Sequence, residues 1–270
     1  MKHLRWVTLF VALLWCSNAL ALDGTSLDYE VQFPASGASM YVLDNAALEQ
    51  SGASYFACGV RYKQKPIGSQ QYYFLLSKHD NSGAGNAAFL LASDNGKPFF
   101  KVNKDPTGIV KAQISSPAPA PSSMTLNTAT GQIFFNNPGI CGVTLWINGN
   151  IISPVSNSNV NSMNDNNLPV VLGADGVVNN RGFEGNIYQA WLAYASIPIV
   201  TADQKVTDWS TSKTALPFDP AGVSRYFFWN GSGLTGNRWV ESGVSLGKTP
   251  GQFDMLPNKN PQIIIPAEGP

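Results

Sequence analysis

A tight hairpin near the middle of the chain constrains the fold more than any other stretch. Val143, Leu145 and Ile147 alternate with other residues, which is the period-two pattern of a strand with one apolar face. Asn148 and Gly149 follow, and these residue types accept the positive φ values that a two-residue type I′ turn requires. This stretch is therefore predicted to form an antiparallel β-hairpin.

A second strand in the same half of the chain is predicted to contain a β-bulge. Phe183, Gly185 and Ile187 share one face of an extended strand. Ala190 and Tyr194 continue the same apolar face only after a shift of one residue. One extra residue inserted into an antiparallel ladder produces such a shift.

Strand-like runs dominate the rest of the chain, and helical periodicity is nearly absent. The other predicted strands are 29–33, 40–43, 54–62, 71–77, 87–92, 98–102, 109–114, 132–135 and 170–172, with added strands expected at 226–229, 238–240 and 262–265. Asn95 and Gly96 mark a second hairpin turn. The prolines of 115–123 exclude regular ladder pairing there. A capping-box pattern predicts one short helix over 201–209.

The first 21 residues are predicted to be a secretory signal peptide. Lys2 and Arg5 are basic, residues 6–15 form an apolar run too short to span a bilayer, and 19–21 offer a small-residue cleavage site. The mature chain is then expected to begin near Leu22 and to be secreted, in the extracellular space or the periplasm. A membrane anchor is the alternative interpretation.

The overall charge is balanced and the charged fraction is low. The chain has 17 basic and 17 acidic residues, and charged residues make up 13% of it. No basic patch indicates a nucleic-acid partner, and no second apolar run indicates a membrane span. The many glycines and prolines, together with the aromatic residues, are typical of an extracellular β-protein with many turns.

Two cysteines, Cys58 and Cys141, follow the predicted signal peptide. In an oxidising compartment a lone pair of cysteines is most simply a disulfide, so we predict a bond between them. Two buried free thiols are the alternative, because the sequence does not show how close the two β-carbons lie.

Six short motifs occur in a characteristic order along the chain. They are a tyrosine–valine strand and turn at 41–48, a leucine–serine–lysine strand at 74–78, an aromatic-x-Asn-Gly hairpin at 145–149, a short strand ending in glycine at 170–173, a Phe-x-Gly-x-Ile strand at 183–187 and a final helix at 201–209. Over roughly residues 27–210 they resemble a laminin-G-like jelly roll of the concanavalin A-like lectin/glucanase superfamily. The resemblance implies an all-β fold, in which two antiparallel sheets pack as a jelly-roll sandwich with one short helix near the domain end.

The chain also departs from that family. Gly139 to Gly142 stand where a Trp-His pair usually precedes the hairpin, and the proline-rich loop is an insertion. The resemblance covers a predicted domain at 22–211. Residues 212–270 lie outside it and form a C-terminal extension with candidate added strands, through which the chain could form oligomers.

The sequence argues against an enzyme without deciding the question. Glucanases of this superfamily carry acids at alternate positions of one strand, and glycoside hydrolysis needs two facing carboxylates. Asp28 and Glu30 have that spacing but lack a third acid, and His79 is the one histidine after the predicted signal peptide. We therefore predict no catalytic residue.

Calcium is the one metal that the sequence suggests, and no cofactor is required. Many members of this fold bind Ca²⁺ through loop oxygens at the rim of a sheet, and Ca²⁺ takes six to eight such ligands. The candidate ligands are Asp80, Asn81, Asp165, Asn166 and Asp175. The same residue types are also the ordinary residues of turns.

A carbohydrate ligand would use aromatic side chains as stacking platforms. The candidates are Trp146, Trp191, Tyr188 and Trp229. Large aromatic residues of a sandwich are more often part of its core, so packing is the alternative role for each of them.

The leading interpretation is a secreted, non-catalytic recognition module that binds a glycan or a surface protein. A structural or assembly protein of an envelope, appendage or particle is the first alternative, suggested by the proline-rich loop and the aromatic extension. The second alternative is a polysaccharide hydrolase or lyase with an atypical site. The fold alone does not choose between them, because one scaffold hosts many functions.

Overall fold

A computed structural model describes most of the predicted domain and parts of the C-terminal extension. The described residues are 30–33, 38–44, 48, 53–65, 72–79, 87–104, 107, 111–120, 126–135, 141–157, 160–175, 182–201, 204–211, 216–229, 238–242, 252–254, 256–258 and 262–264. The predicted signal peptide lies outside them. Within these ranges, no helix is long and apolar enough to cross a membrane.

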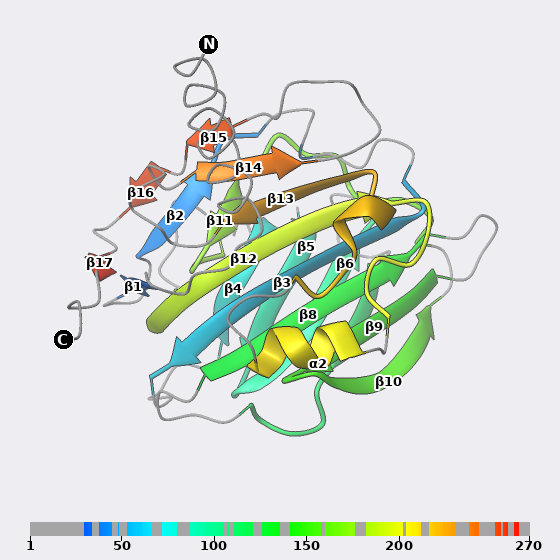
Figure 1. Cartoon of the computed structure of the whole chain (residues 1–270), viewed down its shortest axis with the longest axis horizontal. Coiled ribbons are helices and arrows are strands. Elements are labelled where there is room, and N and C mark those ends of the chain that lie inside the picture. The colour runs from blue at the N-terminus through cyan, green and yellow to red at the C-terminus, as the bar shows by residue number, and fades with distance from the viewer. Residues whose placement is uncertain are drawn as a thin grey trace, which may run out of the picture.

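The larger of two sheets contains ten strands, and every pairing in it is antiparallel. In spatial order the main path is β10 (Asn150–Asn157), β9 (Cys141–Ile147), β8 (Leu126–Phe134), β3 (Tyr55–Gln64), β12 (Gly185–Ala195), β13 (Arg225–Trp229), β14 (Arg238–Ser242) and β15 (Gln252–Asp254). Off this path, β1 (Glu30–Phe33) pairs with β12 and with β17 (Gln262–Ile264). The sheet spans the width of Figure 1.

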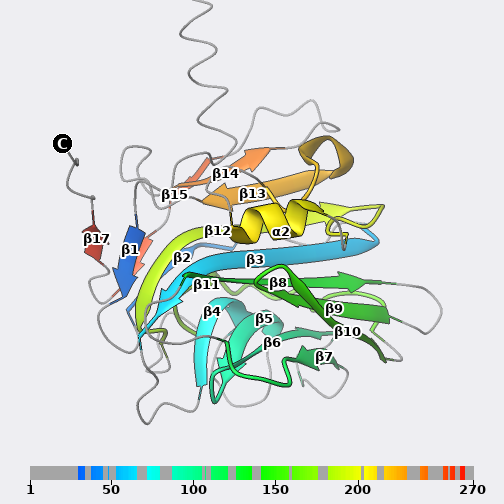
Figure 2. The same cartoon turned by 60° about the horizontal axis from the view of Figure 1, so that its bottom comes forward.

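The smaller sheet contains seven strands, also antiparallel. Its order is β16 (Leu256–Asn258), β2 (Ser39–Val42), β11 (Val170–Leu172), β4 (Tyr72–His79), β5 (Ala87–Asp94), β6 (Lys97–Asn103) and β7 (Lys111–Ser115). Figure 2 shows the two sheets as stacked layers, with helix α2 (Gln204–Thr211) on the outer side of the larger one. A 3₁₀ turn, η2, spans Pro220–Gly222. The predicted two-sheet sandwich with one short helix is confirmed.

The two turns and the bulge predicted from the sequence are confirmed. Asn148 and Gly149 have φ values of 52° and 79°, and the residues of the second predicted turn, Asn95 and Gly96, have 49° and 77°. The register of β12 against β3 shifts between Ile187 and Gln189. Tyr188 is therefore the extra residue of the predicted bulge.

The C-terminal extension continues both sheets. Strand β13 pairs with Ala190 to Tyr194 of β12, and β14 and β15 add to it in turn. Strand β16 joins the smaller sheet at β2, and β17 pairs with β1. The extension thus contributes strands to the framework of the sandwich.

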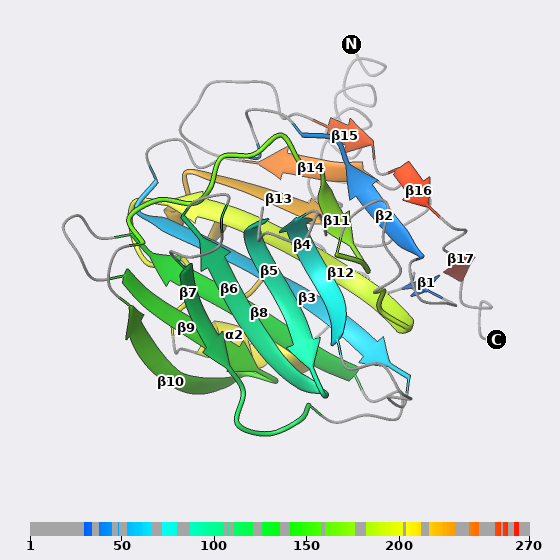
Figure 3. The same ribbon diagram turned by 180° about the vertical axis from the view of Figure 1, so that it is seen from behind.

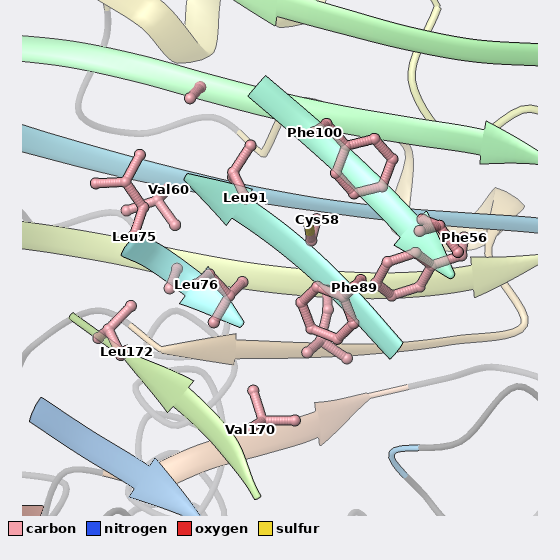
Figure 4. Packing of buried hydrophobic residues seen from close by; sticks show 14 of the residues in the cluster. Phe56, Cys58, Val60, Leu75, Leu76, Phe89, Leu91, Phe100, Val170 and Leu172 are labelled. Carbon is pink, nitrogen blue, oxygen red and sulfur yellow. The ribbon is translucent and has the colours of Figure 1, made fainter. Parts of the chain in front are cut away.

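The core lies between the sheets and is built from apolar side chains of both. Figure 4 shows Phe56, Cys58 and Val60 of β3 among the side chains of the smaller sheet. At the tightest point, Phe100 of β6 lies directly on the backbone of Gly131 in β8. A Cβ atom on that glycine would come within 2.2 Å of the Phe100 ring. The absence of a side chain at this position is therefore what lets the two sheets approach.

The predicted disulfide between Cys58 and Cys141 is not formed. Cys58 is a free thiol, fully buried between the sheets. It pairs across the ladder with Gly131, and Gly131 pairs with Leu145, four residues from Cys141 on the next strand. The two Cα atoms are therefore two strands apart across the sheet and four residues apart along the strand, which is a distance of about 16 Å. A disulfide allows at most about 7 Å between Cα atoms.

We expect Gly131→Ala to lower the free energy of unfolding by about 1–3 kcal/mol, because its new methyl group would overlap the Phe100 ring. Gly142→Ala is the matched control, since a Cβ atom there meets nothing within 4 Å. Urea denaturation of both variants measures the difference. Equal stability of the two variants would show that the close approach is not required.

A second prediction concerns Cys58. Burial raises the pKa of its thiol, so the nucleophilic thiolate is scarce in the folded chain. In a Cys141→Ser variant, a thiol reagent should label Cys58 only after unfolding in guanidinium. The variant should also unfold at the temperature of the wild type. A loss of about 2–5 kcal/mol would instead indicate that a disulfide had been removed.

Candidate functional site

The outer face of the larger sheet carries an unusual row of polar and aromatic side chains. Arg61 of β3 lies opposite Thr128 of β8 on one side and Gln189 of β12 on the other. One row further along, Gly59 lies between Thr130 and Trp191. Alternate residues of a strand share a face, so these side chains point to the same side of the sheet.

Two tryptophans flank this row within the sheet. Trp146 of β9 pairs with Thr130 and lies beside it on the outer face. Trp191 lies flat on the backbone of β3, because a Cβ atom on Gly59 would come within 2.6 Å of its Nε1. The glycine thus lets the indole cross β3 towards β8. We call Arg61, Thr130, Trp146 and Trp191 the outer-face cluster.

Helix α2 lies on the outer face of the larger sheet (Figure 1). Trp209 of the helix places its ring 5.3 Å from the guanidinium carbon of Arg61. The Trp209 Nε1 donates to Gln189 Oε1 at 3.1 Å, and the ring meets Trp191 edge to face with centroids 6.1 Å apart. Phe218, in the segment after the helix, also contacts the Trp191 ring. The helix and the following segment thus form an aromatic cover over the sheet.

Gln132 of β8 holds the chain segment that precedes helix α2 through hydrogen bonds to its backbone. Its Oε1 accepts hydrogen bonds from the backbone N–H groups of Ile199 and Val200, at 2.9 and 2.8 Å. Its Nε2 donates to the carbonyl of Val200 at 3.0 Å. All three bonds are buried, and together they hold the segment before α2 against the sheet.

Arg61 carries a buried charge on the outer face of the larger sheet. Its side chain is 1% exposed, and none of its three nitrogens has a hydrogen-bond partner among the described residues. Burial lowers its pKa to about 10. A guanidinium with that pKa still carries its charge at neutral pH, and an unpaired buried charge costs on the order of 3–5 kcal/mol. The cation–π contact with Trp209 offsets only part of this, about 2 kcal/mol.

The rest of the outer-face cluster is also rich in donors. Within the described ranges, Trp146 Nε1, Trp191 Nε1 and Thr130 Oγ1 are buried without a hydrogen-bond partner. An indole N–H only donates, and a hydroxyl can donate. The cluster therefore presents several hydrogen-bond donors and little to accept their bonds.

A second polar region lies at one end of the smaller sheet. His79, the last residue of β4, has its Nδ1 3.0 Å from the carbonyl of Asp175. A carbonyl can only accept, so Nδ1 carries the hydrogen. Asn164 donates its backbone N–H to the carbonyl of Asn103 and its side-chain amide to the carbonyl of Ala87. Figure 3 shows that β4 and β6 end at the same edge.

A buried ion pair belongs to this region. Lys78 is fully buried, and its Nζ lies 2.8 Å from Asp44 Oδ1, just after β2. Val42 of β2 pairs with Val170, which brings the segment 163–168 to the same edge. We call Asp44, Lys78, His79, Asn164 and Asp175, with the loops that carry them, the polar rim.

The structure brings several of the predicted calcium ligands to this rim. Asp175 is buried beside His79, Asp165 is exposed, and Asn166 is buried with its Oδ1 accepting from the N–H of Leu168 at 3.3 Å. Asp80 and Asn81 lie outside the described residues. No group of three or more His, Cys, Asp or Glu able to hold a metal occurs in the described part of the chain.

The four predicted stacking residues are all buried. Trp146 and Trp191 belong to the outer-face cluster, and Trp229 packs in the core between the sheets. Tyr188 occupies the bulge of β12, with Lys63 Nζ 5.3 Å from its ring centre. None of these rings is an open platform in this structure, so packing accounts for their positions.

The structure describes one of the three side chains considered for an enzyme. Asp28 lies outside the described residues, and only the backbone of Glu30 is described, in β1. His79 stacks on Phe74, with ring centroids 6.2 Å apart, and is held by the Asp175 carbonyl. Its position is that of a side chain fixed in a loop contact.

Sequence reasoning missed Arg61, Thr130 and Gln132. Arg61 stands between Val60 and Tyr62 in the predicted strand 54–62, and that placement was the available signal. Thr130 lies in the first half of β8, where the sequence predicted no strand. The partners of Gln132 are almost 70 residues away along the chain.

No protein-family model matches the chain, and no curated protein matches its sequence. Similar shapes occur among solved structures. The heptameric SAP-like pentraxin of Limulus polyphemus has a TM-score of 0.48 at 12% identity, over 69% of this chain and 83% of that one. The CBM40 module of the Ruminococcus gnavus IT-sialidase, bound to α2,3-sialyllactose, has 0.42 at 17%, over 60% and 88%. The mouse laminin α1 domains LG4-5 have 0.42 at 17%, over 61% and 40%.

We expect Gln132→Leu to lower the free energy of unfolding by about 1–3 kcal/mol, since it leaves buried backbone N–H groups without an acceptor. Gln113→Leu on the exposed face of β7 is the matched control and should change stability by less than about 0.5 kcal/mol. Thermal unfolding of both variants tests this. A Gln132→Leu variant as stable as its control would show that the clamp contributes nothing.

Proposed function

We propose that this chain is a non-catalytic recognition module that binds a glycan or a surface protein through the loops of the polar rim. The observation that carries the proposal is the convergence of polar groups from distant segments at one end of the smaller sheet. Binding residues are concentrated on loops that a rigid scaffold positions. The rest of the sandwich supplies that scaffold.

The chemistry of the polar rim suits a ligand rich in hydroxyl groups. The exposed carboxylate of Asp165 accepts hydrogen bonds. The neighbouring loops carry amides, which both donate and accept. A sugar hydroxyl does both as well, so a mixed set of this kind can satisfy it. The four candidate stacking residues, by contrast, are buried in the packed layers.

The arrangement of the two sheets also favours the rim over other surfaces. The space between the sheets is filled by apolar side chains, and α2 covers part of the outer face of the larger sheet. We therefore assign contact with a partner to the loops. We propose that Ca²⁺ takes part there, held by Asp165 and neighbouring loop oxygens, which supply the ligand type that calcium prefers.

A glycan array tests the proposal, run once with Ca²⁺ and once with a chelator. We expect binding to at least one glycan class, weakened by chelation. Asp165→Ala should weaken that binding about tenfold, because a charged hydrogen-bond acceptor or metal ligand is lost.

Asp94→Ala is the matched control, because Asp94 lies at the opposite end of the smaller sheet. It should bind like the wild type. The protein arm of the proposal is tested by coupling candidate surface proteins to a biosensor. Flat glycan signals together with the absence of any protein partner would contradict the proposal.

A further inference from the structure

We propose that the outer-face cluster is a binding site for a small oxyanion, held by Arg61 beneath helix α2. This site lies on the larger sheet, away from the polar rim. It is therefore independent of the recognition role proposed above, and either proposal can fail without the other.

Arg61 is a buried charge without a hydrogen-bond partner in the described part of the chain. Its side chain is 1% exposed, and no acceptor among the described residues contacts its nitrogens. A buried polar group without a partner is rare in folded proteins and calls for an explanation such as a bound ion. An arginine remains charged at all ordinary pH values, so it cannot relieve its burial by losing a proton.

The side chains near Arg61 also carry hydrogen-bond donors without partners within the described ranges. The ladder places Thr130 and Trp191 one row from it on the same face, and Trp146 next to Thr130. Diagonal neighbours on adjacent strands lie roughly 7–8 Å apart, which is within reach of long and aromatic side chains such as those of Arg61 and Trp191. The free polar atoms of all four side chains are potential donors.

The donors of the outer-face cluster determine which class of ligand it can bind. A set of donors around a positive charge excludes cations and favours an acceptor with negative charge. A guanidinium offers two parallel N–H groups, which match the two oxygens of a carboxylate or a phosphate. The aromatic cover, in which Trp209 contacts Arg61 and Phe218 contacts Trp191, keeps bulk water away and so strengthens such a contact. A small oxyanion therefore fits this cluster.

The shared chemistry is an oxyanion, and two sources can supply it. One is a free inorganic ion such as phosphate, and the other is the carboxylate of an acidic sugar. Phosphate and glucuronate serve as the two probes. Acetate reports whether a bare carboxylate is enough.

The test measures thermal unfolding of the full chain while each anion is titrated at constant ionic strength. We expect the wild type to gain thermal stability with a saturable dependence on at least one probe, because a ligand that binds only the folded state stabilises it. A response to phosphate indicates the inorganic ion, and a response to glucuronate alone indicates the acidic sugar. No saturable response to any probe would overturn the proposal.

Arg61→Met removes the charge and keeps an unbranched side chain. We expect it to abolish the saturable response, leaving only the general salt effect that any folded protein shows. Lys205→Met is the matched control, because it removes one exposed positive charge from the same covering helix and should keep the response. An equal response in wild type and Arg61→Met would also overturn the proposal.

A gentler variant guards against a failure of Arg61→Met to fold. Thr130→Val keeps the shape of the side chain and removes its hydroxyl. Isothermal titration calorimetry should then show about tenfold weaker binding of the responding anion, the usual loss for a hydrogen bond to a charged group. Unchanged affinity in this variant would place the anion outside the outer-face cluster and contradict the assignment.

Discussion

The structure depends on the close approach of two sheets across a shared apolar interior. Phe100 of the smaller sheet rests on the bare backbone of Gly131 in the larger one, and no side chain could stand between them. Around that contact, Phe56 packs against Phe89 and Tyr194. This interior leaves the loops at the sheet ends as the natural place for variation, because loops tolerate change that a close-packed core does not.

The larger sheet is also buried on much of its second face, and that is the less ordinary feature. Strand β12 is buried along its whole length, because the smaller sheet covers one side and α2 with the following segment covers the other. Enclosing a second face traps whatever polar side chains it carries. Gln132 meets this demand with three hydrogen bonds to the covering segment. The nitrogens of Arg61 have no such hydrogen bonds to any described residue, and burying an unpaired charge has a large cost in free energy.

The two candidate sites therefore differ in kind. The polar rim gathers loop residues at an edge, and its exposed carboxylate, Asp165, is available to a large partner. The outer-face cluster is enclosed, so it suits only a small ion or the charged group at the end of a ligand. They lie on different sheets and share no described residue. The same sandwich can thus present one surface to a partner and hold an ion beneath its helix.

Local patterns determined part of this protein from the sequence alone. The Asn148–Gly149 turn and the bulge at Tyr188 were predictable because turn chemistry and side-chain alternation act between near neighbours. The first half of β8 was not predictable, because Thr128 and Thr130 are polar and their burial depends on segments that are distant in the sequence. The same limit applies to the cysteines. Only the ladder register, set by contacts between distant segments, decided that Cys58 stays a free thiol and that Arg61 lies beneath α2.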